Sequence, residues 1–591
     1  MGGFLLKRTS LQESAGGERQ VFERKGFSSP ARFLLGEWEL LLYRKILLEE
    51  DNFVQNGTHK LFCCGTLIYF GLGYRDSLNR LLSDFQHREI DQSELIGHFC
   101  VFYWNGKSLK ILTDRLNTFH VFVNNERSIF SSSFLSLLAA SPEPLPLNRM
   151  AVCEKLSTGY IVSPDTLVEG ISQINDDLAD VISHSKEGIE FLPHPSQRSI
   201  QFHNKGIGDS LDRQACSLAG HFKNLEALHT EHTGELGLSD GFDSRLLLAC
   251  TRRFPKAVSL HTHSTKGIHF QSAALVQEIA KSVGLPLKVV ETRTLQALEN
   301  REFDEDVNDG LFYFDARCSH NMGAMSQTYT RKYKREVLGQ NRLSFNGLGG
   351  EVYRNYYDVR RHSTFELRGW MDLNVYYPLA QEAIGDPDLY EAMHENKLSK
   401  ISSRLNVEFK DKTDFLGIRR YYSEVRMPDC DAINSDAQNQ LSFYHMPFTD
   451  PSLVCEGINA TPYIGLGGDY QAALIKKLSP KLAKFTSHYG YSFNSRAPLK
   501  NRLKSKLREE LPAGFLYKRL KHSLFENRNS ALESANRLIN ERSLMRESRE
   551  ALLEFGVIKS LEDALLHYAQ RPTTLYLGVF LREFQSKLKR D

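Results

Sequence analysis

The chain has 591 residues, of which 41% are hydrophobic and 25% are charged. This composition is typical of folded globular proteins and excludes disorder, collagen or a coiled coil throughout. At about 150 residues per domain, the length predicts two to four domains. Lys and Arg total 74 against 72 Asp and Glu, so no charge bias indicates nucleic acid or an acidic membrane as a partner.

The nine cysteines show no metal-binding pattern. None lies in a Cys-x-x-Cys motif or at a zinc-binding distance from histidine, so we interpret them as reduced thiols. The apolar run after Met1 is too short for a signal peptide, and no segment approaches the ~18 apolar residues of a membrane span. The sequence therefore predicts a cytoplasmic protein that binds neither nucleic acid nor membrane.

Residues 61–138 show a pattern of short strands. Asn105-Gly106 is a strong signal for a two-residue hairpin, and Gly, Asn and Asp separate the apolar runs. We expect an antiparallel sheet here, followed by a Pro-rich break at 141–146 and by mixed short elements to about residue 201. The expected strands are 60–64, 67–70, 98–104, 109–113 and 121–124.

From about Asp209 the pattern changes to alternating helices and strands. The βαβαβ order predicts a parallel sheet covered by helices on both faces. The region after Phe365 is expected to be mainly helical. The expected elements are strands 234–238, 257–261 and 287–290 and helices 211–228, 244–250 and 271–283.

The first strand-to-helix junction carries the loop Ser239-Asp-Gly-Phe-Asp-Ser244. In an open parallel sheet, ligands bind at the carboxyl ends of the strands, where a helix N-terminus offers free N–H groups. Ser239, Gly241 and Ser244 are small enough to let amides approach a phosphate, and Asp243 is a candidate Mg²⁺ ligand. The spacing excludes a P-loop. A plain turn followed by a capped helix is the structural alternative.

This loop resembles the Ser-Gly-Gly-x-Asp-Ser pyrophosphatase loop of the asparagine synthetase family, with Asp240 in place of the first glycine. Residues 345–354 resemble the second, Gly-rich nucleotide loop of that family. Glu351 matches its glutamate, whereas Gly350 stands in place of its aspartate. These two motifs occur in the family's order and at its spacing.

Two more motifs extend the resemblance toward the C-terminus. Residues 447–450, Pro-Phe-Thr-Asp, are similar to the Pro-Phe-Leu-Asp segment near the family's acceptor pocket. Residues 506–521 look like the C-terminal run in which a lysine reaches the active site, which is Lys521 in this chain. Chance does not readily explain four motifs that occur in the same order as in the family.

The N-terminal part resembles the family's glutamine amidotransferase domain at 97–99, 112–117 and 129–133, so the resemblance covers roughly residues 60–525. It implies a degenerate amidotransferase-like domain over 1–204, an α+β sandwich of the Ntn-hydrolase type. It also implies an ATP-binding domain over 205–591, with an α/β parallel sheet of the adenine nucleotide α-hydrolase type. The cysteine that the family uses as glutaminase nucleophile is absent, because Gly2 follows Met1.

The resemblance therefore implies an AMP-forming carboxylate–amine ligase without glutaminase activity, similar to the β-lactam synthetase and lasso-peptide cyclase branch. The implied cofactors are ATP and Mg²⁺, and the implied partners are a small-molecule or peptide carboxylate and an amine donor; a homodimer is left open. The implied site consists of Leu238, Ser239, Gly241, Asp243, Ser244, Leu260 and Gly347 for the nucleotide, Asp243 and Glu351 for the metal, and Glu351 and Lys521 for catalysis.

Other functions stay open. Asp240 and Gly350 favour a catalytically silent scaffold that binds nucleotide. A tRNA-modifying adenylase on the same loop is disfavoured, because the chain lacks paired catalytic cysteines and a basic bias. The structural alternatives are a helix cap for Asp243, a surface residue for Glu351 and a solvated cationic helix face for Lys521.

Overall fold

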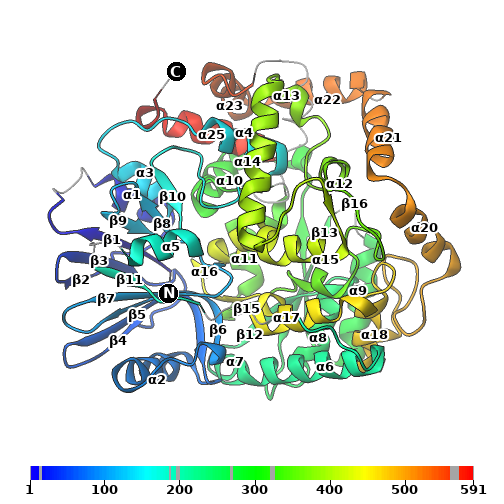
Figure 1. The fold of residues 1–591 in the computed structure, drawn as a ribbon, viewed down its shortest axis with the longest axis horizontal. Coiled ribbons are helices and arrows are strands. Elements are labelled where there is room, and N and C mark those ends of the chain that lie inside the picture. Colours follow the sequence, from blue (N-terminus) through cyan, green and yellow to red (C-terminus); the bar gives the residue numbers. More distant parts are fainter. Residues whose placement is uncertain are drawn as a thin grey trace.

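The computed structural model describes residues 2–11, 16–184, 188–194, 200–265, 270–319, 326–526, 528–558 and 572–589. It is an α/β structure with mixed sheets, in which two sheets of the N-terminal half lie beside a parallel sheet surrounded by helices (Figure 1). None of the described helices is both long enough and apolar enough to cross a bilayer.

The N-terminal half is built from two stacked sheets. Side chains from both sheets form one core, in which the Phe4 and Phe102 ring centroids lie 4.7 Å apart. The first sheet has the order β10-β8-β9-β1-β3-β2, with β1 Gly3–Arg8, β2 Ala31–Leu35, β3 Trp38–Tyr43, β8 Phe122–Asn124, β9 Ile129–Ser131 and β10 Ile171–Gln173. The second has the order β11-β7-β6-β5-β4, with β4 Phe53–Asn56, β5 His59–Tyr69, β6 Leu95–Trp104, β7 Leu109–Thr113 and β11 Ile189–Phe191.

The predicted antiparallel pairing is confirmed, since β6 and β7 form a hairpin, but their connection spans residues 105–108 and is longer than the two-residue turn predicted at Asn105-Gly106. Three features differ from the predicted strands. The expected strands 60–64 and 67–70 form the single strand β5, because Gly65 stays in register opposite Phe99. Strand β8 joins the first sheet, and β1, β2 and β3 lie in a region where no strands were predicted.

The C-terminal half contains the predicted parallel sheet. All four strand pairs in the order β14-β13-β12-β15-β18 are parallel. The strands are β12 Gly234–Gly237, β13 Ser259–Thr265, β14 Leu287–Thr292, β15 Leu343–Phe345 and β18 Phe443–His445. The βαβαβ prediction is confirmed by α6 Ile207–Asn224, α8 Phe242–Thr251 and α9 Phe270–Val283, which alternate with the first three strands.

The order of these strands creates a crevice. From β12 the chain builds β13 and β14 on one side and then returns to place β15 and β18 on the other. Connections therefore leave β12 and β15 in opposite directions, and the carboxyl ends of these two neighbours are the usual ligand site of such sheets. The other elements of the fold hold the carboxyl ends of β12 and β15 in place.

The region after Phe365 is mainly helical, as predicted. Its helices surround the parallel sheet and continue along the outer edge of the molecule (Figure 1). They include α12 Leu367–Asn374, α13 Ala380–Ile384, α14 Pro387–Leu405, α16 Ala432–Asn439, α17 Pro451–Asn459, α18 Asp469–Leu478, α20 Leu499–Glu510, α21 Ala513–Glu526, α22 Arg528–Glu541 and α23 Ser543–Glu554.

The C-terminal end of the described chain returns to the N-terminal half. Helix α25, Pro572–Glu583, packs against α4, Arg149–Thr158 (Figure 1). Its Phe580 ring lies 5.9 Å from the ring of Phe134, and Leu588 forms a parallel bridge with Leu145. The last described helix thus packs on residues 134–158 of the N-terminal half.

Candidate active site

A cavity of about 230 Å³ opens at the carboxyl ends of β12 and β15. Both loops predicted from the sequence contribute to it, one after each strand. It therefore lies in the crevice where a ligand is expected in an open parallel sheet. Its lining consists of Glu235, Gly237, Ser239, Asp243, Ser244, His261, Lys334, Ser344, Phe345, Asn346, Gly347, Leu348 and Glu351.

The first loop is shaped by its own hydroxyl groups. The Ser239 and Ser244 hydroxyls lie 2.8 Å apart, and the Ser239 N–H donates to the Ser244 hydroxyl at 3.0 Å. Gly241 precedes α8 and has no side chain with which to cap that helix. The first N–H groups of α8 are therefore left for an anionic ligand, which the helix dipole also favours.

Arg354 bridges the two carboxylates of the site. Its Nη2 donates to Asp243 Oδ2 at 3.0 Å and to Glu351 Oε1 at 2.9 Å. The other two oxygens are also bonded: Gln471 donates to Asp243 Oδ1 at 2.8 Å, and the Tyr422 hydroxyl donates to Glu351 Oε2 at 2.7 Å. All four carboxylate oxygens therefore have a donor.

The charges in this cluster influence one another. Burial raises the pKa of Asp243 to about 6; Glu351 acts in the same direction, whereas Arg354 and Gln471 oppose it. Burial lowers the pKa of Arg354, but Asp243 and Glu351 outweigh burial and hold that pKa above its ordinary value. The guanidinium is thus charged throughout the physiological range.

This arrangement does not fit the predicted Mg²⁺ site. The oxygens of Asp243 and Glu351 that would bind the metal instead accept hydrogen bonds, two of them from one guanidinium nitrogen. Within the described part of the chain, no group of three or more His, Cys, Asp or Glu side chains is placed to hold a metal ion. Gly350 adds no ligand, and a Cβ atom there would lie 2.3 Å from Asp243 Oδ1.

A buried contact between a histidine and a glutamate, which the sequence did not reveal, lies beside the predicted loops. His261 Nδ1 is 2.5 Å from Glu235 Oε2, and the Ser344 hydroxyl donates to the same carboxylate. Burial would raise the pKa of Glu235, but His261 and Ser344 lower it below its ordinary value. Burial also lowers the pKa of Lys334. The only sequence signal was a glutamate inside the apolar strand 234–238.

Asp240 is directed away from the cavity. Its Oδ1 lies 2.8 Å from His488 Nδ1, and its carbonyl accepts from Arg245 Nη2 at 2.8 Å. Burial tends to raise the pKa of Asp240, but the contacts with His488 and Arg245 lower it. Asp240 is not among the residues that line the cavity.

If this cavity binds ATP, as the resemblance implies, replacing Asp240 with glycine should leave the ATP affinity within a few-fold of the wild-type value. A carboxylate 4 Å from a phosphate charge would repel it by ~4 kcal/mol at an effective dielectric of 20, so removing one would tighten binding by about a thousandfold. The measurement is calorimetric titration with ATP, with Asp240→Asn as the isosteric control. A gain of more than about a hundredfold would show that the carboxylate does face the phosphates.

The structure does not bring Lys521 to the cavity. Lys521 lies on α21, forms an ion pair with Glu382 of α13, and its side chain is 29% exposed. Helix α21 is held along α12, and the Tyr517 hydroxyl donates to the Pro378 carbonyl at 3.3 Å. The expectation that Lys521 serves this site is therefore corrected, because the packing of α21 directs it to another partner.

Leu238 and Leu260 also lie outside the cavity lining, since both are buried in the body of the sheet. Gly241 is placed at the start of α8, next to the lining serines. Gly347 lines the cavity, where a Cβ atom would lie 3.1 Å from the Asp243 carbonyl carbon. The backbone of the second loop thus approaches the first loop closely.

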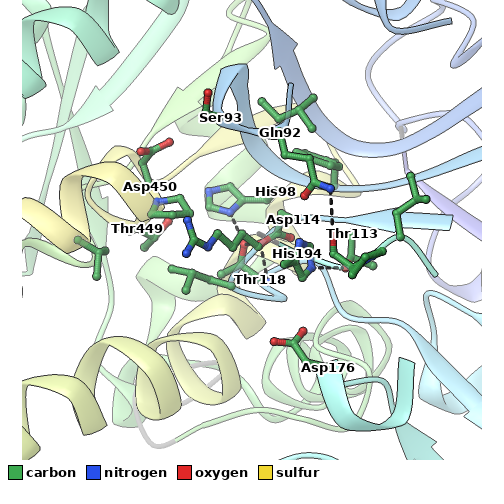
Figure 2. A pocket seen from close by; sticks show the side chains of 18 of the residues that line it. Gln92, Ser93, His98, Thr113, Asp114, Thr118, Asp176, His194, Thr449 and Asp450 are labelled. Carbon is green, nitrogen blue, oxygen red and sulfur yellow. Dashed lines mark hydrogen bonds between the residues drawn. The ribbon is translucent and has the colours of Figure 1, made fainter. Parts of the chain in front are cut away.

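A second cavity of about 810 Å³ lies where the second N-terminal sheet, β11-β7-β6-β5-β4, meets the end of β18 (Figure 2). Thr449 and Asp450 line it, so the predicted acceptor segment 447–450 borders this larger cavity. The same segment packs against the second loop, because a Cβ atom on Gly349 would lie 3.0 Å from Thr449 Cγ2. Residues 447–450 thus border the second cavity and pack against the loop that lines the first.

The polar groups at the centre of the second cavity are satisfied within the protein. Asp114 accepts from the N–H groups of Thr118 and Phe119, each at 2.9 Å, and burial raises its pKa to about 6. His98 contacts the Thr118 hydroxyl and accepts from the Met446 N–H at 3.0 Å (Figure 2). Burial lowers the pKa of His98 to about 3, so it is neutral at physiological pH.

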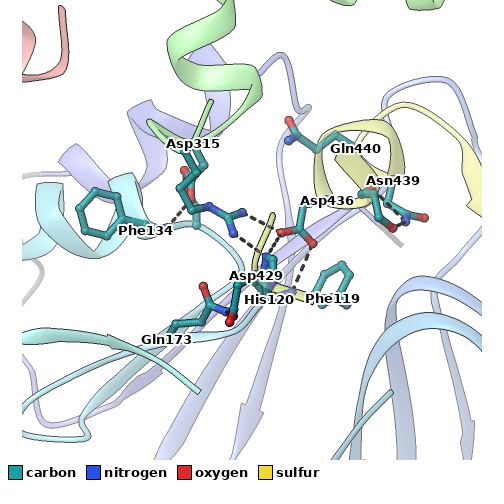
Figure 3. A network of polar contacts seen from close by, with 12 residues as sticks. Phe119, His120, Phe134, Gln173, Asp315, Asp429, Asp436, Asn439 and Gln440 are labelled. Atoms are coloured by element: carbon teal, nitrogen blue, oxygen red, sulfur yellow. Dashed lines mark hydrogen bonds and ion pairs between the residues drawn. The ribbon is translucent and has the colours of Figure 1, made fainter. Parts of the chain in front are cut away.

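A buried polar network joins the two halves of the chain (Figure 3). Asp436 of α16 lies 2.6 Å from His120 Nδ1 and accepts from Arg317 Nη2 at 2.7 Å. Asp315 accepts from the Phe134 N–H at 2.5 Å and from the Ser133 hydroxyl at 2.6 Å. These contacts fix the halves relative to each other, so the cavity between them has preformed walls.

The first cavity combines helix N–H groups, two hydroxyls and the Lys334 side chain, a set that suits a phosphate-bearing ligand. The Arg354 guanidinium lies in an adjoining pocket and is bonded to two carboxylates of the cavity lining. Comparison of the chain with protein-family models gave no match, and a search of curated proteins found no significant similarity. The function must therefore be argued from the site itself.

Proposed function

We propose that the chain is an ATP-dependent, AMP-forming carboxylate–amine ligase of the asparagine synthetase type. The observation that carries this proposal is the meeting of the Ser239–Ser244 loop with the 345–354 loop at one cavity. In this proposal residues 205–591 have the adenine nucleotide α-hydrolase type of fold. Residues 1–204 form a degenerate amidotransferase domain of the Ntn-hydrolase type.

The reaction has two steps. An oxygen of the substrate carboxylate attacks the α-phosphorus of ATP, and the bond to the leaving pyrophosphate breaks. The amine then attacks the carbonyl carbon of the acyl-adenylate, AMP leaves, and the amine loses a proton. A carboxylate and an amine do not condense unaided at neutral pH, so AMP serves as the leaving group.

The site residues have distinct proposed roles in these steps. The N–H groups at the start of α8 and the hydroxyls of Ser239 and Ser244 hold the phosphates. The guanidinium of Arg354 balances the charge that builds on the leaving pyrophosphate. Glu351, held by Arg354 and Tyr422, accepts the proton from the amine.

The substrates are expected on the side of the cavity away from the phosphates. Tyr356, Tyr357 and Tyr422 surround Glu351 and Arg354 in a small adjoining pocket. Thr449 and Asp450 line the larger cavity, in keeping with the resemblance of residues 447–450 to an acceptor segment. We propose a small-molecule or peptide carboxylate and an amine donor as substrates, in a cytoplasmic protein without nucleic-acid or membrane partners.

The proposal can be tested without knowing the natural amine. Hydroxylamine traps an acyl-adenylate as a hydroxamate, so a panel of amino-acid and short-peptide carboxylates can be screened with ATP and hydroxylamine. The expected result is equimolar pyrophosphate, AMP and hydroxamate with at least one carboxylate. Absence of ATP binding by calorimetry would refute the ligase and the nucleotide site together.

A second candidate function is a catalytically silent scaffold that binds nucleotide. The specific observation in its favour is Arg354, which occupies the carboxylate oxygens expected to hold Mg²⁺. A scaffold would bind ATP in the calorimeter but release no pyrophosphate with any carboxylate. The two candidates therefore give different results in the same pair of assays.

No glutamate should be released from glutamine by the purified protein. Ammonia release by a thiol requires an accessible thiolate. Cys63, Cys64, Cys100 and Cys153 in the described N-terminal half are all buried, and burial raises the pKa of Cys63 to about 12. Glutamate is measured with and without ATP, against a known glutaminase as positive control. Turnover that is lost on substitution of one of these cysteines would contradict the expectation.

A further inference from the structure

Arg354 takes the position in which a divalent cation would link Asp243 to Glu351. One nitrogen, Nη2, lies 3.0 Å from Asp243 Oδ2 and 2.9 Å from Glu351 Oε1. A hard cation held by two carboxylates likewise contacts an oxygen of each around a single centre. The carboxylate arrangement expected for Mg²⁺ is therefore present, with a guanidinium at its centre.

The guanidinium is held from other sides as well. Its Cζ lies 5.3 Å from the ring centroid of Tyr356 and 5.9 Å from that of Phe242, within the range of cation–π attraction. The Arg354 side chain is only 11% exposed. The next residue, Asn355, donates its N–H to the Gly467 carbonyl at 2.9 Å. Arg354 is thus a built part of the site and not a solvated surface side chain.

Within the described part of the chain, no third His, Cys, Asp or Glu side chain joins Asp243 and Glu351 in a group that could hold a metal ion. A Cβ atom on Gly350 would lie 2.3 Å from Asp243 Oδ1 and 3.1 Å from Asp243 Cβ, so an aspartate does not fit there while Asp243 keeps its position. Gln471 and Tyr422 occupy the outer carboxylate oxygens as hydrogen-bond donors. The arginine cancels one of the two negative charges that would attract a metal ion.

We propose that Arg354 is the resident cation of this carboxylate pair and that no divalent metal ion binds between Asp243 and Glu351. The nucleotide would meet a fixed guanidinium at this position in place of a protein-bound metal ion. This statement about the nucleotide rests on the proposed function. Metal binding between Asp243 and Glu351 depends on the side chains alone, so it is tested in the absence of nucleotide.

Removing the guanidinium should create a metal site. Arg354→Met keeps a long side chain but loses the charge, which leaves two facing carboxylates with no cation. Mn²⁺ binding, measured by loss of the free-ion signal in electron paramagnetic resonance, should be at least about tenfold tighter than in the wild type. Millimolar MnCl₂ should also raise the unfolding temperature of Arg354→Met and leave that of the wild type unchanged.

The double variant Arg354→Met/Asp243→Asn is the matched control. It has the net charge of the wild-type site but lacks one of the two carboxylates, so it should show neither effect. Equal Mn²⁺ affinity in the folded single and double variants would overturn the proposal. Should Arg354→Met fail to fold, the wild type decides: a Mn²⁺ site in the wild type that Asp243→Asn removes would also overturn it.

ATP titrations of the wild type separate this proposal from the ligase hypothesis. ATP affinity in excess EDTA should be within a few-fold of that in MgCl₂. If ATP binds in neither buffer while the Mn²⁺ results are as expected, the ligase hypothesis fails and the role of Arg354 stands. If ATP binds only with MgCl₂ and the wild type holds Mn²⁺ through Asp243, the role of Arg354 fails and the ligase hypothesis stands.

Discussion

Replacing Asp243 with asparagine should lower pyrophosphate release in the hydroxylamine assay by about 10²–10³-fold, because it frees the Arg354 guanidinium, which is the group proposed to stabilise the developing charge. Asp243 lies in the first turn of α8 and accepts from both Arg354 and Gln471. The asparagine side chain is uncharged, so it would not hold the Arg354 guanidinium beside the Ser239–Ser244 loop. We expect the loss in the rate of adenylation, with ATP affinity changed less.

Asp212→Asn is the control for this experiment. The Asp212 side chain is 65% exposed and forms an ion pair with Lys477 on the surface, so its replacement should leave the rate unchanged. If Asp243→Asn released pyrophosphate at a rate within a few-fold of the wild-type rate, Asp243 would have no role in adenylation. If Asp243→Asn failed to bind ATP, the role of Asp243 would be to hold the nucleotide instead.

Replacing Glu154 with alanine should lower the free energy of unfolding by about 3–5 kcal/mol, because it leaves a buried ammonium group without its partner. Lys397 Nζ donates to Glu154 Oε1 at 2.7 Å, and their side chains are 0% and 1% exposed. Glu154 also accepts from Lys400 at 2.8 Å and from the Val162 N–H at 3.0 Å. The pair joins α4 to α14. The measurement is urea unfolding followed by circular dichroism.

Glu37→Ala is the matched control, since the Glu37 side chain is 80% exposed in its ion pair with Arg8; its effect should be within about 0.5 kcal/mol. Burial tends to raise the pKa of Glu154, but Lys397 and Lys400 hold it below its ordinary value. The stabilisation is therefore present at neutral pH and is lost as the pH falls through the folded-state pKa. A difference between Glu154→Ala and wild type that grows in acid would contradict this account.

The parallel sheet could be predicted from the sequence because its signals are local. The short runs that contain its first three strands alternate with segments of helical periodicity, and the Ser239–Ser244 loop follows the first strand closely. Strand β3, Trp38–Tyr43, was missed because a short run that is apolar almost throughout fits a buried strand or a helix equally well. The pairing of β3 with β1 and β2 makes this run a strand and not a helix.

The part of the site that could not be predicted depends on distant residues. Arg354 meets Asp243 across 111 positions of sequence, and an arginine after a glycine-rich turn carries no signal of that contact. Lys521 illustrates the reverse error. Its motif is local, but the partner it finds, Glu382, depends on how α21 packs along α12. Tertiary packing, rather than motif spacing, assigns these charges their partners.

The return of α25 to the N-terminal half has a consequence for synthesis of the chain. Phe580 packs against Phe134, and Leu588 bridges to Leu145, so the last described residues complete a surface made by the first third of the sequence. Contacts of such long sequence separation slow folding. During translation this apolar face of the N-terminal half therefore stays uncovered until α25 has left the ribosome, and exposed apolar surface of this kind favours aggregation in the meantime.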